Sequence, residues 1–97
     1  MVIITKTVLV EFGEKYADSA EALDNWYNKS KNANWKNLNE LKKTFSSVDY
    51  VGNDRYVFNI KGNKYRMVVM IFFDIRTMFI RFIGTHAEYD KVDCTKI

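Results

Sequence analysis

The spacing of apolar residues changes once along this chain, and that change constrains the fold more than any other feature. Up to about residue 45, apolar side chains recur three or four positions apart, as on one face of a helix. Between residues 54 and 61 they alternate instead, with Tyr56, Phe58 and Ile60 on one face of a β-strand. Helices followed by consecutive strands predict an α+β domain in which N-terminal helices pack on an antiparallel sheet.

Capping and turn residues mark where these elements begin and end. Asp18 and Asn37 stand at helix N-cap positions, each with a Glu three residues later. Gly62-Asn63 is a two-residue hairpin signal that pairs Asn59 with Arg66. The predicted elements are a strand at 2–5, helices from 5 or 7 to 16, from 18 and from 37, strands at 48–51, 54–61, 64–73 and 78–85, and a helical turn at 87–92.

Length and composition exclude several classes of protein. The 97 residues are 47% hydrophobic and contain no repeat or linker, so residues 1–97 are expected to form a single domain. One Cys and one His cannot build an internal disulfide or a usual zinc site, and no cofactor is expected. The longest apolar run, at 67–73, is too short to cross a membrane, and charged residues interrupt the N-terminal apolar stretch. The expected location is the cytoplasm.

The net charge of +3 is unevenly distributed along the chain. Residues 55–86 hold six basic residues, including all four arginines, against one acid, and residues 25–43 hold five lysines against one acid. The other segments are acidic. Basic segments on a small domain indicate a polyanion partner, usually nucleic acid. For a charge cluster alone, however, a merely solvated surface is the simpler explanation.

Strand alternation gathers basic side chains on one face of the predicted sheet. With Gly62-Asn63 as the loop and a further loop of two or four residues near 74–77, that face carries Asn59, Lys61, Lys64, Arg66, Phe79, Arg81, Ile83 and Thr85. The opposite face carries Phe58, Met67, Val69, Ile71, Ile80 and Phe82, which suits packing on the helices. Arg66 and Arg81 together favour a functional role, and pairing with an acid or solvation is the alternative.

The only imidazole of the chain, His86, directly follows the last predicted strand. If the next residues are helical, Tyr89 lies on the same side. Imidazole suits proton transfer near neutral pH, so His86 is a candidate acid or base, although a structural hydrogen bond is the commoner role of a lone histidine. Thr85 is equally suited to cap the final turn, and Cys94 is interpreted as an inert thiol.

Two C-terminal blocks carry a family resemblance. They are Val57-Phe-Asn-Ile-Lys-Gly-Asn-Lys-Tyr-Arg66 and Ile80-Arg-Phe-Ile-Gly-Thr-His-Ala-Glu-Tyr-Asp-Lys91, and Trp26 and Asn34-Trp35-Lys36 agree with them. Over essentially its whole length the chain resembles the HigB family, RelE-like toxins of type II toxin–antitoxin systems. The resemblance implies a small RelE-like domain with a curved antiparallel sheet. It also implies an mRNA interferase, an endoribonuclease that cleaves mRNA at the ribosome and inhibits translation.

The partners implied by the resemblance are mRNA, the ribosome with its rRNA, and a HigA-type helix-turn-helix antitoxin. DNA would be contacted only indirectly, through the antitoxin complex, and no membrane partner is expected. The alternatives are a non-catalytic RNA- or ribosome-binding module, and a degenerate toxin that acts only in antitoxin binding and autoregulation.

The resemblance further implies a metal-free reaction in which the ribose 2′-hydroxyl attacks the adjacent phosphorus and leaves a 2′,3′-cyclic phosphate. Arg66 and Arg81 suit the charge that develops on the phosphorane. His86 suits proton transfer, with Tyr89 as its helper or alternate. RNA or ribosome binding is expected from Lys36, Lys61, Lys64, Thr85 and Lys91. Lys29, Lys31, Lys42 and Lys43 are either further docking residues or plain solvated surface.

Overall fold

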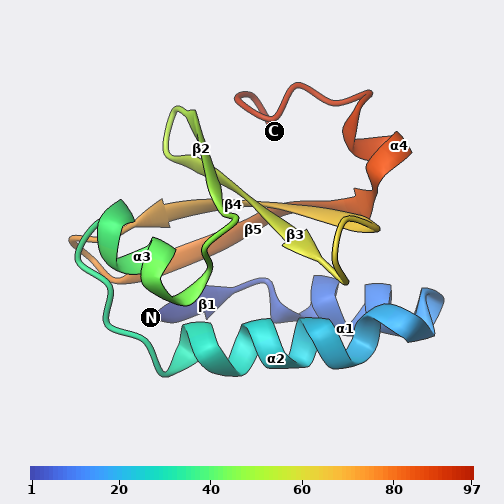
Figure 1. Cartoon of the computed structure of the whole chain (residues 1–97), viewed down its shortest axis with the longest axis horizontal. Coiled ribbons are helices and arrows are strands. Elements are labelled where there is room, and N and C mark those ends of the chain that lie inside the picture. Colours follow the sequence, from blue (N-terminus) through green and yellow to red (C-terminus); the bar gives the residue numbers. More distant parts are fainter.

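In a computed structural model, all 97 residues are described, and the N-terminal helices pack on one face of a five-stranded sheet (Figure 1). The helical elements are α1 (Lys6–Lys15), the 3₁₀ turn η1 (Ala17–Ser19), α2 (Ala20–Lys31), α3 (Leu38–Thr44) and α4 (His86–Tyr89). The strands are β1 (Val2–Ile4), β2 (Asp49–Gly52), β3 (Arg55–Ile60), β4 (Tyr65–Phe72) and β5 (Thr77–Thr85). In Figure 1, α1 and α2 lie below the sheet, whereas α4 and the C-terminal segment (residues 90–97) lie above it. The predicted α+β class is confirmed.

The sheet is mixed rather than purely antiparallel. Its strand order is β1-β5-β4-β3-β2, and every neighbouring pair is antiparallel except β1, which runs parallel to β5. The expectation of an antiparallel sheet is therefore wrong for this edge strand, because a short β-branched stretch carries no signal of direction. None of the helices combines the length and apolar character needed to cross a membrane.

The two predicted helix caps have different outcomes. Asn37 caps α3 as expected, because its Oδ1 accepts a hydrogen bond from the Glu40 amide at 3.0 Å. Asp18 does not cap α2, which begins at Ala20 without a side-chain cap. The Asp18 carboxylate instead accepts a hydrogen bond from the Tyr65 hydroxyl at 2.6 Å and pairs with the Lys64 ammonium. This tertiary contact ties the η1 turn to the first residues of β4, so the local capping signal was misleading.

Asp18 should make the stability of the fold depend on acidic pH. The hydrogen bonds from Lys64 and then from Tyr65 lower the pKa of the Asp18 carboxyl. A carboxyl with a lowered folded-state pKa stabilises the fold fully above its ordinary value of about 4, and this contribution is lost as the pH falls through the lowered value. The melting temperature of an Asp18→Asn variant is therefore expected to fall less steeply than that of wild type below about pH 4.

Thermal melts across this acidic range measure the effect. Asp24→Asn is the matched control, because Asp24 is exposed on α2 and forms no ion pair. The control should keep the wild-type profile. Parallel profiles for wild type and Asp18→Asn would contradict the role of the Asp18 contacts in stability.

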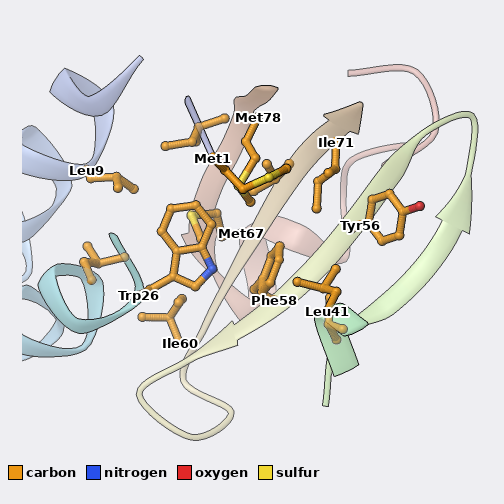
Figure 2. Close-up of a cluster of buried hydrophobic side chains, with 14 of the residues drawn as sticks. Met1, Leu9, Trp26, Leu41, Tyr56, Phe58, Ile60, Met67, Ile71 and Met78 are labelled. Atoms are coloured by element: carbon orange, nitrogen blue, oxygen red, sulfur yellow. The ribbon is translucent and has the colours of Figure 1, made fainter. Parts of the chain in front are cut away.

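The hydrophobic core lies between the helices and one face of the sheet (Figure 2). The side chains of β4 that face the helices, Tyr65, Met67, Val69 and Ile71, are all buried, as strand alternation predicts. Trp26 of α2 is buried and projects toward Phe58 in Figure 2, with the two ring centroids 5.4 Å apart in an edge-on arrangement. Aromatic packing of this kind contributes beyond simple burial of area.

A substitution of Leu41 in α3 tests whether this residue belongs to the hydrophobic core. Its side chain is 0% exposed. Truncation by Leu41→Ala is expected to lower the free energy of unfolding by ~2–5 kcal/mol, since it removes buried methyl groups and leaves a cavity. Chemical denaturation measures this loss. Val10→Ala on the exposed side of α1 is the control and should cost less than ~1 kcal/mol, so equal losses would contradict the packing described here.

The β3–β4 hairpin has the predicted register. Asn59 pairs with Arg66, and the strands are joined by the four residues 61–64, with Ile60 paired with Tyr65. Lys61 lies in this loop rather than in β3, and its φ of 55° is in the left-handed region. The predicted turn is therefore present, but the loop includes Lys61 and Lys64 in addition to Gly62-Asn63.

A β-bulge changes the faces of β5. Val69 pairs with Ile80 but Val68 pairs with Phe82, so Arg81 is an extra residue in β5. Side chains beyond the bulge exchange faces. The predictions that Ile83 and Thr85 share a face with Arg66, and that Phe82 faces the helices, are therefore wrong. In the structure Ile83 packs against the core, whereas Phe82 and Gly84 are paired with the β4 residues of the opposite face.

The C-terminal segment (residues 90–97) is anchored to the sheet through Arg55. This residue is 8% exposed, and its Nε and Nη2 donate to the backbone oxygen of Ile97 at 3.1 and 2.7 Å. The Asn53 side chain donates to the Thr95 carbonyl at 2.9 Å. By strand alternation Arg55 shares a face with Arg66, so the segment is held on the side of the sheet away from α1 and α2.

Candidate active site

Arg66 is the centre of a polar cluster on the sheet face away from α1 and α2. Its Nη2 donates to Asn63 Oδ1 at 2.9 Å and lies 3.2 Å from Nε2 of His86. The guanidinium carbon lies 5.4 Å from the ring centroid of Tyr89, within the range of a cation–π contact. The hairpin loop, β4 and α4 therefore all meet at one guanidinium group.

Local signals at the end of β5 position α4 for these contacts. Thr85 Oγ1 accepts a hydrogen bond from the Glu88 amide at 3.2 Å, and the Glu88 carboxylate accepts one from the Thr85 amide at 2.9 Å. This is a capping box, so the predicted N-cap is confirmed. The hydrogen bond from the Thr85 backbone amide, followed by one from the Thr85 side chain, lowers the pKa of the Glu88 carboxyl. A Cβ at Gly84 would lie 3.1 Å from the Glu88 carboxylate, so glycine lets the turn pack closely on β5.

The two ring nitrogens of His86 have different partners. Nε2 faces Arg66, whereas Nδ1 lies 3.2 Å from Oδ2 of Asp90, one helical turn later. The His86 side chain is 44% exposed, so a ligand can reach the ring while its orientation is fixed from both sides. This combination suits a residue that transfers protons.

Tyr89 closes the cluster from the side of the C-terminal segment. Its ring centroid lies 6.4 Å from that of His86, and its hydroxyl donates to Sγ of Cys94 at 3.8 Å. Burial, followed by the contact with Cys94, raises the pKa of the Tyr89 hydroxyl. The phenol therefore holds its proton more tightly than the hydroxyl of an exposed tyrosine does.

Arg66 keeps hydrogen-bond donors and charge that the protein does not use. No carboxylate forms an ion pair with it, Nη1 makes no hydrogen bond, and Nε is buried without a partner. A buried donor without a partner costs about 1–3 kcal/mol, so the unpaired Nε of Arg66 calls for an explanation. The arrangement can hold a phosphate group at Arg66 next to an imidazole that exchanges protons.

Comparison with known proteins places the chain in a family. Residues 19–92 match the family model of the HigB toxin, described as the RelE-like toxic component of a toxin–antitoxin system. The chain belongs to the HigB toxin family. The mRNA interferase toxin HigB of Escherichia coli (strain K12) is 37% identical over 93 residues, covering 93% of this chain and 88% of that protein. The mRNA interferase HigB of Escherichia coli O6:H1 is 33% identical over 94 residues, covering 95% and 91%. The predicted family is confirmed, and these names agree with the predicted endoribonuclease class.

Among the catalytic residues predicted for this HigB-family chain, Arg66, His86 and Tyr89 lie together, but Arg81 lies apart. Arg66 is paired across the sheet with Gly84, and Arg81 is the bulge residue of β5. The Arg81 side chain is exposed and makes no hydrogen bond or ion pair. The structure therefore gathers three of the four predicted residues around one point.

The predicted RNA-binding residues of this HigB-family chain lie in different surroundings. Lys61 and Lys91 are exposed and belong to the hairpin loop and to the residues after α4, which both adjoin the cluster. Lys64 is engaged with Asp18, and Thr85 caps α4. Lys36 lines a separate pocket with Trp35 and Phe72, at the far end of β4 from Arg66.

Sequence reasoning missed two members of the cluster, Asn63 and Asp90. Asn63 was interpreted only as a turn residue, although it precedes Arg66 by three positions in a hairpin. The signal for Asp90 is its position four residues after His86, which places both on one side of a helical turn. Both polar partners are therefore local in sequence to the residue that they orient.

Proposed function

We propose that this HigB-family chain is an mRNA interferase, an endoribonuclease that cleaves mRNA on the ribosome and so inhibits translation. The observation that supports this most directly is the contact between Arg66, a cation without an ion pair, and the half-exposed imidazole of His86. The printed names of the relatives, mRNA interferases, support the same conclusion.

The proposed reaction is a transesterification within the RNA chain. The ribose 2′-oxygen bonds to the adjacent phosphorus, the bond from phosphorus to the 5′-oxygen breaks, and the products carry a 2′,3′-cyclic phosphate and a 5′-hydroxyl. The 2′-hydroxyl loses one proton and the leaving 5′-oxygen gains one. Arg66 is suited to neutralise the charge that develops on the phosphorane, and His86 and Tyr89 are the groups available for proton transfer.

The remaining basic residues are proposed to hold RNA or rRNA outside the reacting bond. Lys61, Lys91 and Arg81 are exposed and free of ion pairs, so each can meet a backbone phosphate. Lys36, Lys64 and Thr85 are weaker candidates, because the last two already have protein partners and Lys36 lies at the far end of β4. The proposed role of Lys36 is docking on the ribosome.

The partner that follows from the proposal is a HigA-type helix-turn-helix antitoxin, which neutralises the toxin. Contact with DNA would then occur only through the antitoxin complex. The toxin is proposed to act in the cytoplasm, where translated mRNA is found.

Incubation of the purified chain with translating ribosomes and a defined mRNA tests this proposal. Wild type is expected to cut the mRNA and to leave 5′-hydroxyl and 2′,3′-cyclic phosphate ends, and the same mRNA without ribosomes tests the dependence on the ribosome. If no mRNA is cut in either reaction, the enzyme proposal is overturned in favour of a non-catalytic ribosome-binding module or a degenerate toxin. Expression in cells gives a second measurement, because growth arrest should be relieved by a neighbouring helix-turn-helix gene product.

A further inference from the structure

The partners of His86 define which of its ring nitrogens carries the proton. A guanidinium group can only donate hydrogen bonds, so Nε2 of His86, 3.2 Å from Nη2 of Arg66, must accept. An ionised carboxylate can only accept, so Nδ1, 3.2 Å from Oδ2 of Asp90, must donate. Both contacts are satisfied together only by a neutral imidazole with its hydrogen on Nδ1.

We propose that Asp90 is a positioning residue that holds His86 as the Nδ1–H tautomer and thereby makes Nε2 the general base of RNA cleavage. This inference rests on the proposed function, and it assigns to His86 the removal of the proton from the ribose 2′-hydroxyl. Asp90 would touch neither the RNA nor the reacting atoms, and it acts only through the imidazole ring. In the same way, a carboxylate in other enzymes orients a catalytic histidine by accepting a hydrogen bond from the ring nitrogen that does not react.

Arg66 links this orientation to the arrival of substrate. In the free protein its Nη2 is shared between His86 Nε2 and Asn63 Oδ1, both neutral acceptors. A phosphate oxygen is a charged acceptor, and hydrogen bonds to charged acceptors are about twice as strong as neutral ones. A bound phosphate therefore draws the guanidinium away from Nε2, while Asn63 limits how far the group moves. The lone pair of Nε2 is then free for the 2′-hydroxyl.

The proton balance of the step follows from this arrangement. Nε2 takes the proton of the 2′-hydroxyl as the bond from O2′ to phosphorus forms, and the ring becomes an imidazolium whose charge the ionised Asp90 stabilises. The bond from phosphorus to O5′ breaks, and the leaving O5′ takes a proton from water. The imidazolium then returns its proton to the hydroxide left behind, which restores both the water and the neutral ring.

The other candidate base in the cluster is Tyr89. Its hydroxyl donates to Sγ of Cys94 at 3.8 Å, and burial raises the pKa of this hydroxyl. A group that holds its proton cannot accept another from the RNA. In the Nδ1–H tautomer, Nε2 of His86 carries an imidazole lone pair beside Arg66, which is why the role of His86 as the base depends on the carboxylate of Asp90.

The single histidine of the chain makes this inference directly measurable. Long-range ¹H–¹⁵N correlation spectra of the ¹⁵N-labelled protein at neutral pH contain signals from one imidazole only. Wild type is expected to show a protonated Nδ1 and an unprotonated Nε2, and Asp90→Ala is expected to shift the ring to a mixture that contains the Nε2–H form. Asp90→Asn should give an intermediate pattern, because its amide can either accept from a protonated Nδ1 or donate to an unprotonated one. Asp93→Ala, in the same segment without a contact to His86, is the matched control.

Cleavage kinetics with mRNA on translating ribosomes complete the test. Asp90→Ala is expected to lower kcat by ~10- to ~100-fold, the range seen when an outer partner of a functional histidine is removed, with KM little changed. Asp90→Asn should recover only part of this loss, since its amide also supports the Nε2–H tautomer. A wild-type ring protonated on Nε2, or an Asp90→Ala variant with an unchanged ring and unchanged kcat, overturns the inference even if the enzyme is active. Absence of cleavage by wild type overturns the general-base role together with the proposed function, whereas the spectra decide the positioning by Asp90 on their own.

Discussion

Replacement of Arg66 by alanine is expected to lower the kcat of mRNA cleavage by ~10²–10³-fold, the loss typical when one group that stabilises transition-state charge is removed. The guanidinium is the only part of the cluster with a full positive charge and no carboxylate partner. Its unused Nη1 can meet a phosphate oxygen as negative charge develops. Because Asn63 still holds the group after a bound phosphate has drawn it from His86, little reorganisation is needed during the reaction itself.

Two further variants make the Arg66 experiment specific. Arg66→Lys should recover only part of the activity, since an ammonium group lacks the planar fork that binds two phosphate oxygens. Arg76→Ala removes an exposed arginine from the loop between β4 and β5 and is expected to cleave like wild type. Ribosome binding by Arg66→Ala, measured by co-sedimentation, should persist. Full cleavage by Arg66→Ala would exclude Arg66 from catalysis.

Replacement of His86 by glutamine is expected to lower kcat by ~10²–10⁴-fold, the contribution usual for a positioned acid or base. Glutamine keeps a hydrogen-bonding group near Arg66 but cannot carry a proton in the neutral pH range. The backbone of α4 should be retained, because its capping box involves Thr85 and Glu88 rather than the imidazole.

Tyr89→Phe provides the comparison for His86. Its hydroxyl is directed to Cys94, so the loss of this oxygen is expected to reduce kcat far less than His86→Gln does. The stacked ring over Arg66 is kept in this variant. If Tyr89→Phe were the more damaging change and His86→Gln cleaved fully, Tyr89 would be the proton-transfer residue and His86 would have no catalytic role.

Local patterns in the sequence were sufficient for most of the fold. Alternation placed the three central strands within one or two residues, and the Gly62-Asn63 signal gave the register that pairs Asn59 with Arg66. These features depend on neighbours in the chain. The parallel direction of β1 and the contact of Asp18 with Lys64 depend on segments far apart in sequence, and no local pattern records them.

The site residues that could be predicted from sequence are those whose type is uncommon at such a position. Arg66 on a sheet face, and a lone His86 followed by Tyr89, are unusual enough to notice. Asn63 and Asp90 are the kinds of residue expected in any turn or exposed helix end, so their role is visible only when their side chains are seen to meet Arg66 and His86. The bulge at Arg81 could not be predicted, because the residues around it are apolar on both faces of the strand. No apolar–polar alternation is present there that would reveal a change of face.

That bulge has a consequence for how the family can vary. One extra residue in β5 reverses the side on which every later residue emerges, and His86 thereby leaves the strand on the side of Arg66 instead of the side of the helices. Substitutions at position 81 alter one side chain, whereas a deletion there would send α4 to the opposite side of the sheet. Ile80 is the residue of β5 that pairs with Val69. Selection should therefore preserve the number of residues between Ile80 and His86 more strictly than the identity of those residues.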